Sequence, residues 1–186
     1  SGGRGKSGGV KIVKNKTEAE IEGEKILNSE FKGMKPSCLL IEGFVPHSEE
    51  LYFSLTVVRP KRKIIALISK HGGVDIEEAS KTGSVIIKEE IDPLLGLMDY
   101  QASNLANNIV NNKHKSNNLA ALLLDFYNFF IKKDLQLLEI NPLVEETNGG
   151  FKALDAKIIA DGNSTFRQSF HKNLFETNSL ITQGEK

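Results

Sequence analysis

The chain has 186 residues, of which 39% are hydrophobic and 26% charged, a profile typical of a globular domain with one sizeable core. Its 24 lysines and arginines balance 24 aspartates and glutamates, so net charge does not favour binding to nucleic acids or membranes. The single cysteine, Cys38, excludes a disulfide framework and is expected to be a small core residue in a reducing compartment. The longest apolar segment, residues 119–131, is too short and too interrupted to span a bilayer, and no secretory signal is visible.

The chain begins with a glycine-rich segment, residues 1–9, and lacks an initiator methionine, so we expect a fragment of a longer protein. The tripeptide Gly5-Lys6-Ser7 resembles the end of a P-loop. A P-loop must open a helix, whereas this segment precedes a strand-like run, so the P-loop interpretation is rejected. Glycine-rich backbone with basic side chains can still hold phosphates through its N–H groups and its charge. By composition alone, a disordered basic tail is an equally good interpretation.

In the first part of the chain, alternating apolar residues predict strands and one acidic segment predicts a helix that Thr17 can cap. The predicted helix covers residues 17–28. Arg59–Arg62 is expected to join two of the strands as a hairpin. The predicted strands cover residues 10–14, 37–44, 51–58 and 63–69.

In the second part, a loop around Pro93 and Gly96 is followed by two helices, and residues 117–132 carry a broad apolar face. The other predicted elements are a short helix at residues 74–80, a strand at residues 84–88 and a helix from Asp99 or Tyr100 to Val110. Mostly antiparallel strand pairs with inserted helices predict an α+β layer.

The most informative pattern consists of two short apolar runs, residues 138–143 and 153–157, joined by turn-forming residues 145–150. Glu139 and Asn141 are two positions apart, so on a strand they share a face and lie about 6.6–6.8 Å apart along it. Carboxylates in such apolar runs usually have partners. A solvated polar hairpin face is the alternative interpretation.

The length of the connecting loop decides which side chains meet. A three-residue loop at residues 147–149 would place Asn141 opposite Asp155 on one face, and a loop at residues 148–150 would keep that face. A two-residue turn would not, because a one-residue slip turns every side chain to the other face. The first two registers bring together four polar side chains. Three of them carry oxygen donors and none is a His or Cys, which suits a hard cation such as Mg²⁺. The four residues are Glu139, Asn141, Asp155 and Lys157.

With these segments in order, the chain resembles the ATP-grasp portion of the succinyl-CoA synthetase (succinate–CoA ligase) β-subunit family. The resemblance implies an α+β ATP-grasp fold, a mostly antiparallel sheet with packed helices, incomplete at the N-terminal side. It covers nearly all of residues 1–168, and its specificity comes from the shared order of the motifs. The segments that carry it are residues 2–11, 49–52, 72–77, 92–94, 138–143, 154–157, 161–163 and 166–168.

The resemblance also implies site residues. Asn141 and Asp155 would bind Mg²⁺, and Glu139 would face a phosphorylated histidine supplied by the α subunit. None of this chain's own histidines need then be catalytic. The residues implied to bind ATP (or GTP) are Gly3, Arg4 and Gly5 at the phosphates, with Glu42, Val45 and Glu50 on the nucleotide side.

The implied reaction is reversible phosphoryl transfer between the nucleotide and that histidine, coupled to formation or cleavage of succinyl-CoA in the tricarboxylic acid cycle. Succinate and CoA would bind to the full hetero-oligomer, in the cytoplasm or alternatively in the mitochondrial matrix. Residues 1–168 would form a partial nucleotide-binding domain, and residues 169–186 a polar tail or linker to a C-terminal CoA-ligase domain. The family's nucleotide-binding lysine and that domain lie outside this sequence, so we expect the isolated chain to be inactive.

Other interpretations remain open on the sequence alone. Malate–CoA ligase and the corresponding part of ATP-citrate lyase share the hairpin motif, and residues 161–168 lean only weakly towards succinate. A non-catalytic module for nucleotide binding or subunit docking is the alternative from a different functional class.

Overall fold

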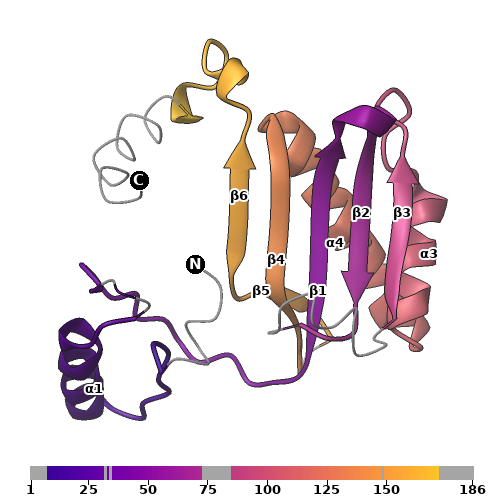
Figure 1. The fold of residues 1–186 in the computed structure, drawn as a ribbon. Coiled ribbons are helices and arrows are strands. Elements are labelled where there is room, and N and C mark those ends of the chain that lie inside the picture. Colours follow the sequence, from indigo (N-terminus) through magenta and orange to yellow (C-terminus); the bar gives the residue numbers. More distant parts are fainter. Residues whose placement is uncertain (1–7, 32, 34, 73–84, 148, 172–186) are drawn as a thin grey trace. The chain divides into compact units, whose positions relative to one another are not determined.

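A computed structural model describes the chain except for residues 1–7, 32, 34, 73–84, 148 and 172–186 (Figure 1). It divides into two compact units, Ser1–Pro46 and His47–Lys186. Among the described residues, no helix has the length and apolar character needed to cross a membrane.

The described part of the first unit is built around helix α1, Lys16–Asn28. The side chain of Asn15 accepts a hydrogen bond of 2.9 Å from the backbone N–H of Glu18 and so caps the helix. The helix was predicted correctly to within one residue, but the predicted cap, Thr17, was wrong. Asn15 satisfies the free N–H group because it lies one position before the first helical residue.

Three other expectations for this unit were wrong. Residues 10–14 and 37–44 do not form strands, and Val10 and Ile12 are 64% and 74% exposed. Cys38 is also exposed rather than part of the core. Alternating apolar residues favour a strand only where a neighbouring strand and a packing surface receive them.

The second unit contains a six-stranded antiparallel sheet with the strand order β3-β2-β1-β4-β5, and β6 also pairs with β4. The β1–β2 hairpin was predicted correctly, with a 3-10 turn η1 (Arg59–Lys61) between its strands. The strands are β1 (His47–Val58), β2 (Lys63–Ser69), β3 (Ile86–Ile91), β4 (Leu135–Glu146), β5 (Phe151–Ala153) and β6 (Ala156–Ala160).

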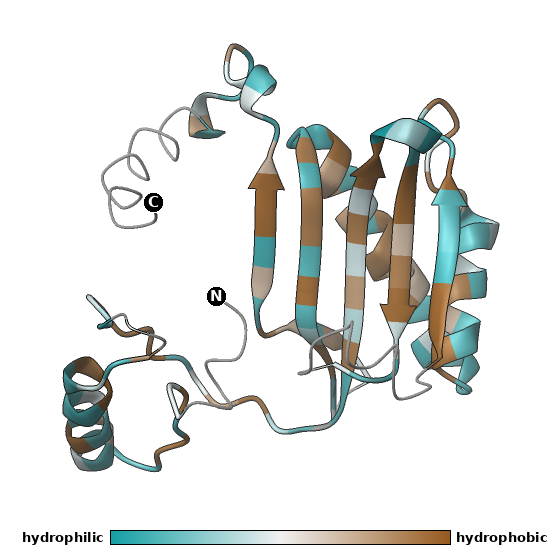
Figure 2. Ribbon diagram, in the orientation of Figure 1, coloured by the Kyte–Doolittle hydropathy of each residue, from teal (hydrophilic) through white to brown (hydrophobic). Residues whose placement is uncertain are grey.

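Helices α3 (Asp99–Ile109) and α4 (Lys113–Lys132) cover one face of this sheet (Figure 1). Hydrophobic and hydrophilic residues alternate along β4, as Figure 2 shows. Phe53 of β1 and Phe126 of α4 stack with ring centroids 5.6 Å apart. The core therefore lies between the helices and this face of the sheet.

Two of the predicted boundaries shift for identifiable reasons. Helix α4 begins at Lys113 rather than at residue 117, because the side chain of Asn112 accepts from the N–H of Lys115 and caps an additional turn. Strand β3 was expected at residues 84–88 but runs from Ile86 to Ile91, as far as its antiparallel pairing with β2 extends. The predicted helix at residues 74–80 lies outside the described residues.

Gln101 connects helix α3 to β3, and only 7% of this residue is exposed. Its side-chain oxygen accepts from the N–H of Met98, and its side-chain nitrogen donates to Glu89 at 2.7 Å. The predicted α+β class with a mostly antiparallel sheet is thus confirmed.

Candidate functional site

The β4–β6 hairpin has the register that places Asn141 opposite Asp155. The N–H of Glu146 donates to the carbonyl of Gly150 at 2.9 Å, which closes a loop of residues 147–149. The N–H of Asn141 donates to the carbonyl of Asp155 at 3.2 Å. Of the three registers left open by the sequence, the structure adopts the first.

The same ladder places Lys157 directly opposite Glu139. On its other side, Glu139 lies opposite Ser54 of β1, which is buried. Because Ile140 belongs to the core, Glu139 and Asn141 on either side of it turn to the face of the sheet away from α3 and α4. The four predicted polar residues therefore gather on one face, beside one another on neighbouring strands.

The donor set fits a magnesium ion that also binds a phosphate. Asn141 and Asp155 offer only oxygen donors towards a cation, as Mg²⁺ prefers, and Mg²⁺ usually takes one or two protein ligands together with phosphates and water. Asp155 is exposed, and one of its carboxylate oxygens accepts from the N–H of Ala156 at 2.9 Å, which orients it. Among the described residues, no group of three or more His, Cys, Asp or Glu side chains could hold a metal.

Glu50, expected on the nucleotide side, lies near the start of β1 and its carboxylate is 3.2 Å from Nε2 of His47. The segment after β2 passes very close to it, because the N–H of Gly72 donates to the carbonyl of Glu50 at 2.7 Å. A Cβ atom at Gly72 would lie only 2.4 Å from the carbonyl oxygen of Leu51. Only glycine fits this close approach of two backbones.

The other predicted nucleotide-binding residues belong to the first unit or lie outside the described residues. Glu42 and Val45 belong to the first unit, where Glu42 is exposed and Val45 half-buried. Gly3, Arg4 and Gly5 lie outside the described residues. Their roles stay predictions.

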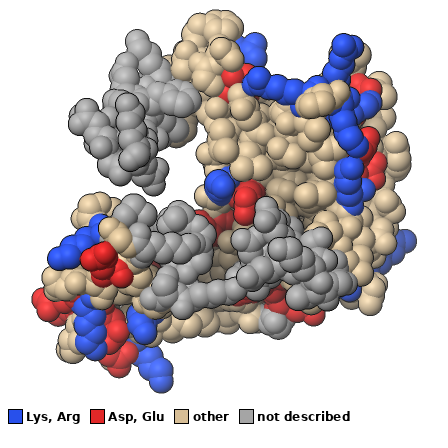
Figure 3. All heavy atoms as spheres, viewed as in Figure 1, with Lys and Arg blue, Asp and Glu red and all other residues tan. Residues whose placement is uncertain are grey.

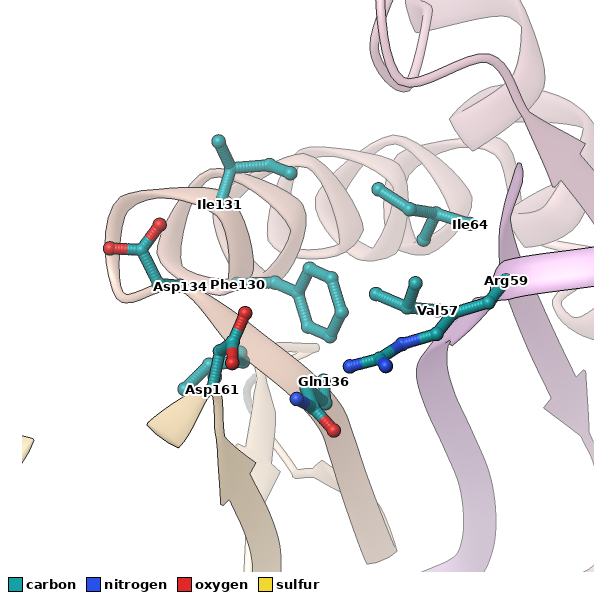
Figure 4. A pocket seen from close by; sticks show the side chains of 9 residues that line it. Val57, Arg59, Ile64, Phe130, Ile131, Asp134, Gln136 and Asp161 are labelled. Atoms are coloured by element: carbon teal, nitrogen blue, oxygen red, sulfur yellow. The ribbon is translucent and has the colours of Figure 1, made fainter. Parts of the chain in front are cut away.

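A hollow with a volume of about 240 Å³ lies at the end of the sheet where β1 finishes and β4 begins (Figure 4). Arg59, Asp134, Gln136 and Asp161 surround it over an apolar floor that includes Phe130. The backbone N–H of Asn163 is the main cause of a lowered pKa at Asp161. Sequence reasoning did not bring these residues together, because they come from three separate segments.

The Phe166-Arg167-Gln168 segment forms hydrogen bonds with the turn between α4 and β4. Arg167 pairs with both carboxylate oxygens of Asp134, and its Nε donates at 2.9 Å. Gln168 donates to Asp134 at 2.7 Å and to the carbonyl of Lys132 at 2.8 Å. Arg167 is the main cause of a lowered pKa at Asp134. This segment of the resemblance therefore has a structural role in the fold.

Comparison with known protein families matches residues 1–145 to the ATP-grasp domain. This chain belongs to the ATP-grasp family. The predicted ATP-grasp fold is thereby confirmed, and the antiparallel sheet with helices on one face is the part of it that the second unit forms.

Relatives with established names match this ATP-grasp chain along its whole length. The β subunit of the ADP-forming succinate–CoA ligase of Staphylococcus haemolyticus is 40% identical, and the match covers 100% of this chain and 49% of the relative. The equivalent subunit of Staphylococcus aureus strain JH9 is 39% identical with the same coverage. The chain thus spans about half the length of the relatives it matches.

Solved structures share the ATP-grasp fold at lower identity. ATP citrate lyase from Methanothrix soehngenii, in complex with citrate and coenzyme A, superposes with a TM-score of 0.63 at 21% identity, over 81% of this chain and 34% of that chain. A D541A variant of the Methanosaeta concilii enzyme gives a TM-score of 0.63 at 19% identity, over 82% of this chain and 34% of that chain.

Proposed function

We propose that this chain is the nucleotide- and magnesium-binding part of the β subunit of an ADP-forming succinate–CoA ligase. The observation that carries the proposal is the pairing of Asn141 with Asp155 across the hairpin. The full-length match to relatives of that name supports it, and their designation favours ATP over GTP. The full enzyme would couple phosphoryl transfer to the formation or cleavage of succinyl-CoA.

Each residue has a defined task in this proposal. Asn141 and Asp155 hold Mg²⁺, which supplies charge neutralisation at the phosphates when bound. Glu139 lies two positions before Asn141 on the same face and receives the phosphohistidine of an α subunit. The residues that hold the nucleotide are Gly3, Arg4, Gly5, Glu42, Val45 and Glu50.

In this proposal, different segments of the protein have different functions. Residues 1–168 form a partial nucleotide-binding domain, and residues 169–186 lead to a C-terminal CoA-ligase domain that completes the succinate and CoA sites. The isolated chain has no ligase turnover. Detection of succinyl-CoA formation by the chain alone would contradict this part of the proposal.

The test is the affinity for MgATP of the assembled ligase, measured by calorimetry with Asp155→Asn. We expect at least about a tenfold loss, because loss of a group that merely supports a metal ligand already costs about 10–100-fold. Asp125→Asn, on an exposed position of α4, is the matched control and should bind as the wild type does. Unchanged affinity in Asp155→Asn would favour a nucleotide-binding module without catalysis.

Substrate selectivity needs a separate measurement. The assembled enzyme is assayed with succinate, malate and citrate at equal concentrations. Preference for succinate is expected. Turnover of malate or citrate in its place would favour malate–CoA ligase or the ATP-citrate lyase type.

A further inference from the structure

Lys157 has a place in the hairpin that the proposed roles leave unused. It lies on β6, an edge strand of the sheet, directly opposite Glu139. Side chains opposite each other in an antiparallel pair have Cβ atoms about 4.5–5.5 Å apart. Lys157 is exposed, so its ammonium group is accessible to a ligand on the face of the sheet away from α3 and α4.

Lys157 is also close in sequence to Asp155, one of the two residues proposed to hold the metal. Asp155 and Lys157 are two positions apart, which corresponds to about 6.6–6.8 Å along a strand. The lysine side chain is a flexible four-carbon stem with a compact charge. A phosphate bound beside Asn141 and Asp155 would therefore lie within reach of its ammonium group.

The negative charges on this face would oppose the binding of a phosphate unless a positive group lies nearby. Glu139 and Asp155 place two carboxylates on the surface where a polyphosphate must approach. Each would repel the phosphate, because charges of the same sign repel each other. Figure 3 shows basic and acidic atoms next to each other on the face of the sheet that is turned towards the viewer.

We propose that Lys157 binds the terminal phosphate of the nucleotide, between the metal-binding pair and Glu139. This inference rests on the function proposed above and adds a phosphate-binding residue to it. A hydrogen bond from an ammonium group to phosphate is charge-assisted and therefore stronger than a neutral one.

The competing explanation is an exposed lysine that only pairs with Glu139 across the strands. Such a pair contributes to sheet stability and not to nucleotide affinity. If Lys157 binds the terminal phosphate, loss of its charge should weaken the binding of MgATP more than the binding of AMP. If it only pairs with Glu139, loss of its charge should leave both affinities unchanged. They also differ in the effect of a variant that keeps the charge.

The test uses the assembled ligase and calorimetry with MgATP and with AMP. Lys157→Met removes the charge and keeps most of the apolar stem, and Lys157→Arg keeps the charge. Lys152→Met is the matched control, because Lys152 is an exposed lysine on β5 of the same hairpin and lies opposite Val144. Unfolding midpoints of all variants separate binding effects from stability effects.

We expect Lys157→Met to weaken MgATP about tenfold or more and to leave AMP within about twofold, as for loss of one bond to a charged group. Lys157→Arg should restore a large part of the affinity, and Lys152→Met should match the wild type. MgATP binding within twofold of the wild type in Lys157→Met would overturn the inference and leave the proposed function standing. An equal loss for MgATP and AMP would overturn it as well, and a wild-type protein that does not bind MgATP would overturn both.

Discussion

The backbone N–H of Asn141 donates to the carbonyl oxygen of Asp155 at 3.2 Å, across the hairpin that carries the candidate site. This bond continues the register in which Glu139 lies opposite Lys157. In this register an amide and a carboxylate lie opposite each other at one edge of the sheet.

If both residues hold one ion, their contributions to nucleotide binding should not be additive. We expect Asn141→Ala and Asp155→Ala each to weaken MgATP binding by the assembled ligase about tenfold or more. The double variant should be little worse than Asp155→Ala, because residues that share a ligand show coupling energies of about 0.5–3 kcal/mol. Calorimetry at saturating Mg²⁺ completes the cycle, and strictly additive losses would speak against a shared ion.

The close approach of Gly72 to β1 predicts that a side chain at this position destabilises the fold. Gly72→Ala would bring a Cβ to 2.4 Å from the carbonyl oxygen of Leu51, so a backbone must shift. We expect a loss of about 1–3 kcal/mol in the free energy of unfolding in urea. Gly162→Ala, which would meet nothing within 4 Å, is the control and should remain within about 0.5 kcal/mol of the wild type.

The stacked pair formed by Phe53 and Phe126 links the centre of the sheet to α4. Phe53 is fully buried, so Phe53→Ala should lower the free energy of unfolding by about 3–5 kcal/mol. Phe53→Leu keeps more of the volume and should cost clearly less. Urea denaturation checks this order, and equal losses in the two variants would contradict it.

Lysines and arginines gather along the edge formed by the β1–β2 turn and β3, as Figure 3 shows at the upper right. Within this group, hydrogen bonds from Lys61 and Lys88 lower the pKa of Glu90 to about 2. A carboxylate with a lowered pKa in the folded state stabilises the fold above its unfolded pKa of about 4.5. That contribution is lost as the pH falls from about 4.5 towards 2.

Glu90→Gln should therefore be less stable than the wild type at pH 7, and the difference should shrink as the pH is lowered through this window. The groups are exposed, so the difference should be small and should decrease at high salt. Urea midpoints at a series of pH values, at low and at high ionic strength, measure it. A difference that stays constant from pH 7 to pH 3 would show that Glu90 acts through something other than its charge.

Several elements were predictable because residues that are close in the sequence decide their structure. The β1–β2 hairpin has alternating residues on both sides of a short turn, and α3 and α4 have apolar faces with helical spacing. The candidate site was predicted from the same kind of information, because Glu139 and Asn141 are two positions apart on one strand. Failures occurred where the outcome depends on partners, as in residues 10–14 and 37–44, since a strand needs a neighbour to complete its hydrogen bonds.

The sequence by itself determined that Glu139, Asn141, Asp155 and Lys157 belong to one hairpin and that a loop of suitable length would bring them together. Only the tertiary structure decided between the possible registers, through the bonds that close residues 147–149 and join Asn141 to Asp155. It also placed Ser54 beside Glu139 and turned the polar row away from α3 and α4. The physical reason is that a turn permits several pairings at similar local cost, whereas burying Leu138 and Ile140 against the helices permits only one face.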